Sequence, residues 1–438
     1  MPGASGVTGG AVSRAGLVLA AICALTSAAL ARDVHVAPGA DEAQADGSVE
    51  APFPTVHKAL RSGVVTGGDR VVLRDGAYGQ IKIAKADYDP PVEIVAQTPG
   101  QVHAEQLLVR DSHGLRFHDL SVWPLRPATK PGNLVEVDRT SSDVAIIGFD
   151  VRGNATAPED YLNWSAEQWL VDWRANGIRV DGDDSVVRDS VVTAVTFGIT
   201  TTGARAEVRD NRVDGFSGDG LRGLGNGSVF AGNHVQNAVS VDDNHDDGFQ
   251  TWATHEDPDG RKSVSDILVE NNTILEWVGP ADHPLRSKLQ GISLFDGIYR
   301  NIVIRNNLVA VDAFHGISVY AGTDSLIANN TVVNISGTPA DHPWILLRDN
   351  RNGWKSGNVE VRNNVAMAFQ GVANWQESNL GIRVPSVFFA APLDRDFRPK
   401  PGGPLIGAGS QDAAVPTDLQ GTPRADPPTL GAFEAGAR

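Results

Sequence analysis

Two short patterns of apolar and polar residues alternate along the second half of the chain. In the first, an asparagine stands two positions before an apolar residue, at Asn211, Asn233, Asn272, Asn307, Asn330 and Asn364. In the second, a glycine stands directly before an apolar residue, at Gly177, Gly198, Gly220, Gly248, Gly291 and Gly316. A repeat built from a short strand and a turn predicts a coil that stacks on itself and displays its side chains in columns.

Alternation within each coil separates the side chains that fill the core from those that face solvent. Apolar residues such as Ile292 and Leu294 are expected to point inward, which leaves Gln250, Ser293 and Ser318 on the outer face of successive coils. The asparagine column is interpreted as structural, because asparagine tolerates the left-handed conformation of turns and its amides stack from coil to coil.

The spacing of the asparagines gives the length of one coil and shows where the repeat is interrupted. Asn211 and Asn233 are 22 residues apart, whereas longer gaps further along the chain predict insertions. These insertions cover residues 252–262, 277–288 and 339–354, and another is expected earlier in the chain at residues 157–173. Together they contain most of the tryptophans. Loops that grow from one edge of a rigid coil are expected to border a binding cleft, although tolerated surface insertions would give the same spacing.

The N-terminal segment is typical of a secretory leader. Arg14 precedes an apolar run over residues 15–24, and the small residues Ala29 and Ala31 form a small-x-small cleavage site, so residues 1–31 are predicted to be a signal peptide. The run is too short for a membrane span. Cys23, the only cysteine, lies inside it. We therefore expect a secreted or periplasmic protein without disulfides.

The mature chain is predicted to be one domain with a cap and a tail. Val56, Ala59 and Leu60 share one helical face, which predicts a short helix over about residues 55–61 that closes the first coil. The coil is expected over residues 32–390. The Pro- and Gly-rich residues 391–438 are expected to form an extended tail that packs along it.

Composition and charge narrow the class of partner. The 47 glycines and the 6% aromatic content fit a protein of strands and turns. The net charge of −16 disfavours nucleic acid, since no basic stripe offsets the field. An anionic substrate would need a local basic patch or a metal ion.

Three parts of the sequence together resemble a known superfamily. They are the opening (36–39, 52–55 and 58–60), the glycine and asparagine repeats, and the ending (421–424 and 431–434). The chain resembles secreted right-handed parallel β-helix proteins of the pectate-lyase-like superfamily. The resemblance implies an all-β fold, a single-domain right-handed parallel β-helix with a short N-terminal capping helix. The superfamily contains polysaccharide lyases, polygalacturonase-type hydrolases, uronate epimerases and phage tail enzymes, and the fold does not choose among them.

The glycines serve as a register that aligns polar residues from different coils. The position before the glycine gives the column Asp219, Asp247, Gln290 and His315. Three positions before the glycine stand Ser217, His245 and Lys288, and two positions after it stand Arg222, Gln250, Ser293 and Ser318. Neighbouring strands lie ~4.8 Å apart, so these side chains are predicted to converge on one patch. Alternation alone would send the position before the glycine inward, so this column requires a bend there.

The patch has the residue types for base-assisted β-elimination on a uronic acid. That reaction needs a neutralised substrate carboxylate, a base for the proton on the adjacent carbon and an acid for the leaving oxygen. Lys288 is a candidate base if burial and cationic neighbours lower its pKa, and His245 and His315 compete for that role. Asp247 is expected to act with them, and Tyr320 is the candidate donor to the leaving oxygen.

Other residues are expected to bind the substrate or a metal ion. The arginines would pair with a carboxylate, the amides would bind hydroxyls and the tryptophans would stack on sugar faces: Arg286, Arg348, Gln250, Gln290, Trp252, Trp277 and Trp344. Lyases of the superfamily often use Ca²⁺ to neutralise the uronate. Asp242, Asp243 and Asp246 are the candidate Ca²⁺ ligands, together with Asp247.

Other functions compete with the lyase hypothesis. Residues 315–318 resemble the Gly-His-Gly segment of polygalacturonases, with Phe314 in place of the first glycine, and residues 244–249 faintly resemble their Asn-Thr-Asp-Gly segment. Their paired aspartates and Arg-Ile-Lys segment are absent, although Asp219 and Asp247 form a possible carboxylate pair. The Tyr-Gly-Phe-Asp-Pro-His-Asp type segment of epimerases is also absent. A module that only binds glycan would not need His245, Lys288 and His315 on adjoining coils. The sequence thus predicts a secreted, monomeric polysaccharide lyase with no nucleic-acid or membrane partner.

Overall fold

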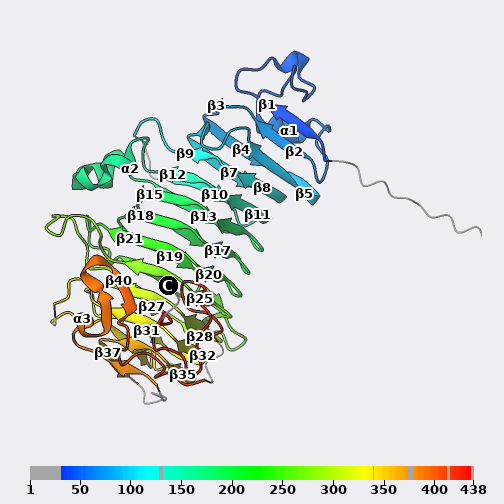
Figure 1. Cartoon of the computed structure of the whole chain (residues 1–438). Helices are drawn as coiled ribbons and strands as arrows, with labels where there is room; N and C mark the ends of the chain where they lie inside the picture. Colours follow the sequence, from blue (N-terminus) through cyan, green and yellow to red (C-terminus); the bar gives the residue numbers. More distant parts are fainter. Residues whose placement is uncertain (1–30, 128–131, 339, 372–377, 412–414, 436–438) are drawn as a thin grey trace, which may run out of the picture. The chain divides into compact units, whose positions relative to one another are not determined.

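Between Asp33 and Gly381, the described residues wind into coils that add strands to parallel sheets (Figure 1). This computed structural model describes residues 31–127, 132–338, 340–371, 378–411 and 415–435. The predicted signal peptide lies outside the described residues except for Ala31. Among the described residues, three large sheets with parallel pairing confirm the predicted parallel β-helix.

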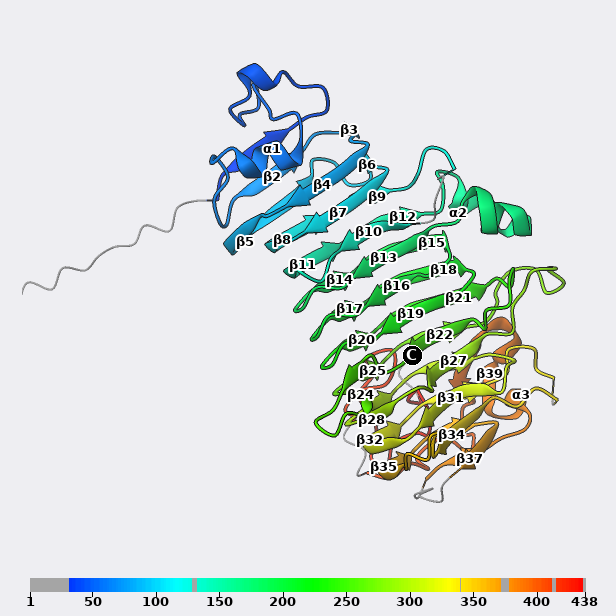
Figure 2. The ribbon, with the colours of Figure 1, turned by 180° about the vertical axis from the view of Figure 1, so that it is seen from behind.

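The third sheet to begin along the chain carries the glycine register, and its strands follow one another from β4 to β37 (Figure 2). It consists of β4 (Gln80–Ala84), β7 (Gln106–Arg110), β10 (Asn133–Val137), β13 (Asn176–Val180), β16 (Ile199–Thr201), β19 (Asp219–Gly223), β22 (Asp247–Thr251), β27 (Gln290–Leu294), β31 (His315–Tyr320), β34 (Trp344–Arg348) and β37 (Ala368–Gly371).

The first sheet lies before the asparagine turns. It consists of β1 (Asp33–Val36), β2 (Arg70–Leu73), β5 (Asp87–Ala96), β8 (His113–His118), β11 (Ser142–Ile147), β14 (Val186–Arg188), β17 (Glu207–Arg209), β20 (Val229–Ala231), β25 (Leu268–Glu270), β29 (Val303–Arg305), β32 (Gly322–Ala328) and β35 (Gly357–Arg362), with β28 (Ile298–Arg300), β24 (Lys262–Ser265) and β23 (His255–Glu256) added at β32.

The second sheet follows those turns. It consists of β3 (Gly76–Ala77), β6 (Val102–Ala104), β9 (Ser121–Val122), β12 (Asp150–Arg152), β15 (Val191–Val195), β18 (Arg212–Phe216), β21 (His234–Ala238), β26 (Thr273–Leu275), β30 (Leu308–Ala310), β33 (Thr331–Val333), β36 (Val365–Ala366) and β38 (Leu380–Gly381). Each coil therefore runs from the first sheet to the second and then to the third.

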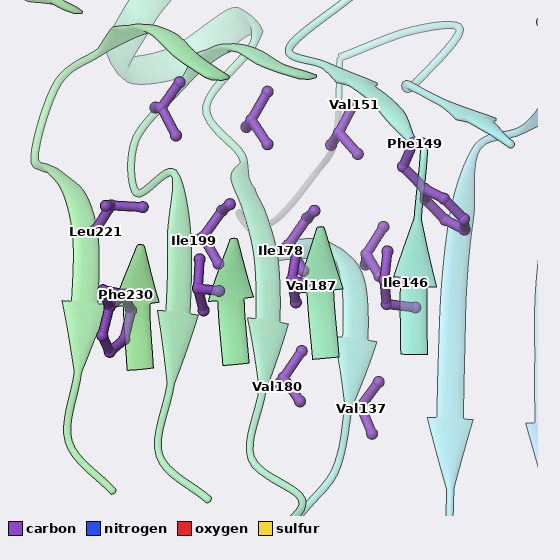
Figure 3. Close-up of a cluster of buried hydrophobic side chains, with 14 of the residues drawn as sticks. Val137, Ile146, Phe149, Val151, Ile178, Val180, Val187, Ile199, Leu221 and Phe230 are labelled. Atoms are coloured by element: carbon purple, nitrogen blue, oxygen red, sulfur yellow. The ribbon is translucent and has the colours of Figure 1, made fainter. Parts of the chain in front are cut away.

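Inward-pointing apolar side chains fill the space between the sheets. Figure 3 shows part of this core, where Ile146, Val151 and Ile178 come from the three different sheets and point toward the inside of the coil. All three are at most 1% exposed. The alternation expected within each strand thus supplies one continuous apolar core, which makes the coils a rigid base for side chains on their outer faces.

The asparagine column is a buried hydrogen-bond ladder, as predicted. Asn272, for example, donates from Nδ2 to the carbonyl oxygen of Phe230 (2.9 Å) and to Oδ1 of Asn307 (3.0 Å). Its own Oδ1 accepts from the backbone N–H (2.9 Å) and Nδ2 (3.0 Å) of Asn233. The expectation that these asparagines adopt the left-handed conformation is wrong. The residue before each one does so, for example Asn271 with φ 55°, and this turn directs the ladder asparagine into the coil.

A short helix closes the N-terminal end, where the sequence predicts one. Helix α1 (Val56–Arg61) begins after Thr55, whose Oγ1 accepts a hydrogen bond from the backbone N–H of Lys58 (3.2 Å). Val56, Ala59 and Leu60 are buried, and α1 lies beside β1 and β2 at that end of the coil (Figure 1). A 3₁₀ turn, η1 (Glu42–Gln44), precedes it.

The C-terminal residues pack on the outer face of the second sheet. They contain α3 (Pro385–Phe388), η4 (Pro392–Asp394) and an antiparallel pair of strands, β39 (Phe389–Ala391) and β40 (Asp396–Pro399). Leu405 and Phe433 share a buried apolar cluster with Val333 and Val365 of the second sheet. The backbone N–H of Ala432 donates to Oγ1 of Thr331 (2.9 Å).

The insertions leave the coil at both edges of the third sheet, and not at one edge as expected. Residues 157–173, which include α2 (Ala157–Asp160), η2 (Tyr161–Asn163) and the π-helical turn η3 (Gln168–Asp172), precede β13, and residues 277–288 precede β27. Residues 252–262 instead follow β22. The reason is that a loop can grow wherever the chain enters or leaves a sheet. The third sheet is therefore flanked by loops on both sides. No helix among the described residues has the length and apolar character needed to cross a membrane.

Candidate active site

The glycine ladder bends the chain and turns the preceding residues outward. A Cβ added at Gly248 would lie 2.4 Å from Cγ2 of Ile274, and one added at Gly316 would lie 2.2 Å from Cγ1 of Val332. The glycines therefore face core residues of the second sheet, and the residue after each one, such as Phe249, is also buried in the core. Because two successive positions face the core, the position before the glycine is free to face outward, as the predicted column requires.

The strand register confirms the alignment based on the glycines. Asp219 pairs with Asp247, and Asp247 pairs with Gln290. Arg222, Gln250, Ser293 and Ser318 follow one another in the second column. On each coil, an outward residue contacts the one three positions later: Asp219 Oδ2 and Arg222 Nε (3.7 Å), Asp247 Oδ2 and Gln250 Nε2 (2.7 Å), Gln290 Oε1 and Ser293 Oγ (3.4 Å), and His315 Nδ1 and Ser318 Oγ (2.8 Å).

Two carboxyl groups on adjacent coils form the buried part of the site. Asp219 is 4% exposed and Asp247 is fully buried. The backbone N–H of Asp247 donates to Oδ1 of Asp219 (3.2 Å). Burial, and then the charge of Asp247, raise the pKa of Asp219 to about 7. Oδ1 of Asp247 has no hydrogen-bond partner among the described residues.

Two cations offset these carboxyl groups. Nδ1 of His245 lies 3.2 Å from Oδ2 of Asp247, and this hydrogen bond raises the pKa of His245 to about 9. The His245 side chain is 61% exposed, so a positive charge reaches the surface beside a buried carboxylate. The Arg222 guanidinium lies 3.5 Å from the ring centre of Phe197. Burial lowers the pKa of Arg222 to about 10, which leaves it charged at neutral pH.

His315 is the neutral imidazole of the site. Burial lowers its pKa from the ordinary value, although the charge of Asp247 acts in the opposite direction. Ser318 Oγ lies 2.8 Å from Nδ1 of His315 and accepts a hydrogen bond from Nε1 of Trp344 (3.1 Å). A hydroxyl oxygen has two lone pairs and can accept both N–H groups. In that tautomer, Nε2 of His315 carries a free lone pair.

Aromatic rings surround the polar patch. Phe295 makes edge contacts with His315 (5.1 Å between ring centres) and Tyr320 (5.5 Å). Trp344 stacks on Phe314, which is 61% exposed. A pocket of about 370 Å³ beside the patch is lined by His245, Gln250, Trp252 and Phe295, together with Asn244, Thr251 and Asp296. Polar groups beside aromatic faces in a shallow pocket suit a sugar ring.

The structure brings eight of the predicted residues together and places others elsewhere. Those that meet on or beside the patch are His245, Asp247, Gln250, Trp252, Gln290, His315, Tyr320 and Trp344. Lys288 has a side chain that is 75% exposed, and its Nζ lies 3.6 Å from Oδ1 of Asp341. The burial and the cationic neighbours on which its role as a base depended are therefore not found.

The two predicted arginines differ in their surroundings. The Arg286 guanidinium is held by two carboxylates, Glu276 Oε1 (2.8 Å) and Asp312 Oδ2 (2.7 Å). Glu276 is fully buried, so this ion pair belongs to the packing beside the second sheet and not to the patch. Arg348, at the end of β34, is exposed, pairs in the sheet with Tyr320 and makes no ion pair with a described residue.

The tryptophans of the insertions also divide into two groups. Trp164, Trp169 and Trp277 are at most 4% exposed and form one apolar cluster that joins residues 157–173 to residues 277–288. Nε1 of Trp277 donates to the carbonyl oxygen of Pro280 (2.7 Å). Trp277 is therefore an anchor for its loop. Trp252 and Trp344 are only partly buried.

The predicted Ca²⁺ ligands do not form a ligand set. Asp242 and Asp243 are exposed, whereas Asp246 is 2% exposed. Burial raises the pKa of Asp246 to about 7, which reduces its value as a carboxylate ligand. Within the described part of the chain, no three His, Cys, Asp or Glu side chains converge in an arrangement that would hold a metal ion. These residues do not fit Ca²⁺, and we derive no catalytic step through it.

The sequence did not predict a role for some residues of the patch. The aligned columns contain Arg222 and Ser318 but assign them no role, and no sequence pattern indicates Phe197 or Phe295. A spacing of three residues between polar side chains on one strand could have indicated Arg222 and Ser318. Asp219 and Arg222 share it with Asp247 and Gln250 on the next coil. The aromatic contacts depend on side chains from different coils and have no such pattern.

Comparisons with known proteins agree with this fold. Residues 139–332 match the family model described as "Right handed beta helix region". The pectate lyase Pel9A is 17% identical with a TM-score of 0.52, over 92% of this chain and 96% of that chain. The A-module of the Azotobacter vinelandii mannuronan C-5 epimerase AlgE6 is 12% identical with a TM-score of 0.50, over 74% of this chain and 86% of that chain.

A more distant match is the PL6 family alginate lyase AlyGC, which is 14% identical with a TM-score of 0.42, over 79% of this chain and 51% of that chain. No curated protein sequence matches the chain. At these identities the similarity concerns the fold. The chain has a right-handed parallel β-helix fold, which it shares with the pectate lyase Pel9A and the epimerase module.

Proposed function

We propose that this protein cleaves a uronic-acid-containing polysaccharide by β-elimination on the outer face of the third sheet. The observation that carries the proposal is a neutral imidazole, His315, on the same face as the cationic His245, within a ladder of coils. The fold shared with a pectate lyase over nearly the full length of both chains supports a polysaccharide substrate. The predicted leader supports action outside the cytoplasm.

The charges of the patch support an anionic substrate. The chain carries a net charge of −16, yet Arg222 and His245 offset the two carboxyl groups of Asp219 and Asp247. Because the pKa of Asp219 is raised to about 7, this acid is partly neutral at neutral pH. The patch therefore carries little net charge and does not repel a uronate. His245 and Arg222 are the groups that would bind its carboxylate and so acidify the proton on the adjacent carbon.

His315 is the proposed base. With Nδ1 donating to Ser318, its Nε2 accepts the proton from the carbon next to the carboxylate. The electron pair of that C–H bond then forms the new double bond, and the bond to the leaving oxygen breaks. Tyr320, which contacts the same Phe295 ring as His315, is the proposed donor of a proton to that oxygen. Trp252 lines the pocket beside His245, and Trp344 contacts His315 and Ser318, so both rings would contact sugar rings.

Glycoside hydrolysis is the second candidate, because Asp219, whose pKa is raised to about 7, lies beside a second carboxyl group, Asp247, on the next coil. Strands on adjacent coils lie ~4.8 Å apart, closer to the ~5 Å of a retaining pair than to the ~6.5–9.5 Å of an inverting pair. Both carboxyl groups are almost fully buried, however, whereas His245 and His315 are accessible. The accessible groups are those of the elimination, which is why we favour the lyase.

The proposal is tested by incubating the protein with alginate, pectate, glucuronan and bacterial exopolysaccharides. We expect one of them to yield products with the ultraviolet absorbance of an unsaturated uronate. His315→Ala should lower this rate at least ~100-fold, the usual contribution of a general base. His118→Ala is the matched control, because that histidine lies on the first sheet beside Glu93. Reducing ends without the absorbance would support the hydrolase, and equal rates for both variants would show that His315 is not the base.

A further inference from the structure

A second pocket lies on the third sheet, on coils nearer the N-terminus than the patch. Its volume is about 540 Å³, and its lining includes Gln80, Gln106, Asn133 and Trp173. Gln80, Gln106 and Asn133 begin β4, β7 and β10, three adjacent strands of the third sheet. Trp173 follows η3 and precedes β13. None of these residues belongs to the site described above.

The floor of this pocket is a row of amides on the outer face of the coil. Gln80 donates from Nε2 to Oε1 of Gln106, whose own Nε2 donates to the carbonyl oxygen of Asn133 (2.7 Å). Asn176 donates from Nδ2 to Oδ1 of Asn133 (3.0 Å). Unlike the inner asparagine ladder, which is buried, this row is exposed or half-buried. The row is thus held in place by its own hydrogen bonds while remaining open to a ligand.

Two hydrogen-bond acceptors without partners and one aromatic ring are the groups of this pocket that could bind a ligand. Among the described residues, the amide oxygens of Gln80 and Asn176 have no hydrogen-bond partner. Trp173 is half-buried, whereas Trp164 and Trp169 of the same insertion are buried as anchors. Trp173 packs against the cluster that contains Trp164 and Trp169, and the part of its side chain that lines the pocket can cover an apolar ligand face. Amides beside a ring suit sugar hydroxyls and the sugar face.

The charges of the lining balance. Glu105 and Asp172 bring two carboxylates, and Arg126 and Arg174 bring two guanidinium groups. Such a lining offers no net attraction for an anion. The chemistry therefore favours a sugar unit recognised through its hydroxyl groups.

We propose that this pocket is a remote subsite that binds a sugar unit of the same polysaccharide chain whose uronate lies at His315; this rests on the proposed function. Six strand steps separate β10 from β31, which carries His315. At ~4.8 Å each, they place the pocket roughly 29 Å from the proposed catalytic base along the sheet. A bound chain must span several sugar units to fill both sites. The enzyme is thus expected to prefer long chains and to cleave within them.

The test separates binding from cleavage. Affinity electrophoresis in gels containing polygalacturonate, alginate or glucuronan measures binding without catalysis. Trp173→Ala is expected to weaken the retardation by at least one polymer about tenfold. Gln106→Ala, which keeps the backbone pairing of β7, is a second variant whose folding does not depend on the aromatic cluster. Trp354→Ala, a half-buried tryptophan outside both sites, is the control.

The outcomes also separate this inference from the proposed function. His315→Ala should abolish product while leaving the retardation unchanged. If no polymer is cleaved and Trp173→Ala still weakens binding, the lyase proposal fails and the subsite stands. If cleavage occurs but Trp173→Ala and Gln106→Ala bind as the wild type and keep its KM for long chains, the subsite is overturned. Absence of retardation by every polymer would overturn it as well.

Discussion

The buried asparagine ladder should be the most sensitive structural feature of the coil. Asn272 is 1% exposed and its side chain takes part in four hydrogen bonds, to Phe230, to Asn307 and twice to Asn233. Asn272→Ala removes all four and leaves the N–H groups of Asn233 and the carbonyl of Phe230 buried without those partners. At roughly 1 kcal/mol for each bond, the free energy of unfolding should fall by about 4 kcal/mol.

The matched control is Asn352→Ala, because that side chain is exposed and makes no hydrogen bond with a described residue. Its effect should stay within ~0.5 kcal/mol. Denaturant unfolding followed by circular dichroism measures the stability of both variants. Hydrogen exchange adds a local reading, since each coil contacts mainly its neighbours. Exchange should accelerate in β20, β21 and β26, next to the substitution, and not in β2 or β5.

The result that would refute the reasoning is specific. If the free energies of unfolding of Asn272→Ala and Asn352→Ala differ by under ~1 kcal/mol, the hydrogen bonds of the ladder contribute no more to stability than exposed hydrogen bonds do. Asn272→Asp gives a further check, because it keeps the acceptor but loses both donors. It also places a carboxylate beside Oδ1 of Asn307. We expect it to be at least as destabilising as the alanine.

Two further predictions concern buried charge. The pKa of Asp219 is raised from 3.8 to about 7, so the folded state binds more protons than the unfolded state between about pH 4 and about pH 7, and this group's contribution to stability falls as pH rises through that window. Asp219→Asn keeps the acceptor for the backbone N–H of Asp247 but does not ionise. The denaturant midpoint of this variant should therefore rise relative to that of the wild type from about pH 4 to about pH 8. A difference between the two midpoints that does not change with pH would contradict the raised pKa of Asp219. Arg286→Met should lower the free energy of unfolding by about 3–5 kcal/mol, because it leaves Glu276 and Asp312 without their cation. Arg348→Met should be close to neutral in the same denaturant titration, and equal stabilities of the two variants would show that the Arg286 ion pairs contribute nothing.

The columns of the site could be predicted because strand register is a local property of the repeat. Each glycine packs its backbone against a core residue of the second sheet, which fixes the preceding residue at the same place on every coil. That is why Asp219, Asp247 and Gln290 align despite the irregular insertions between them, and why Ile292 pairs with Ile317, the residue after the next glycine. Regular packing carries such information through sequence spacing alone.

Residues in the loops could not be placed in the same way. Lys288 precedes β27, where no sheet hydrogen bond fixes its side chain, and its partner Asp341 comes from another loop. Arg286 forms ion pairs with Glu276 and Asp312. Neither carboxylate occupies a position that the repeat pattern aligns with Arg286. Long-range ion pairs of this kind depend on the folded arrangement of loops, so residue type and position alone favoured a role that the contacts do not support.

The proposed elimination is tested most directly by degrading the polysaccharide that the protein cleaves in water labelled with ¹⁸O, and by measuring the masses of the products by mass spectrometry. Elimination breaks the bond without adding water, so we predict an unsaturated end that absorbs ultraviolet light and carries no label. Products that carry the label and lack the unsaturation would contradict the account, and would assign the chemistry to Asp219 and Asp247 instead of His315.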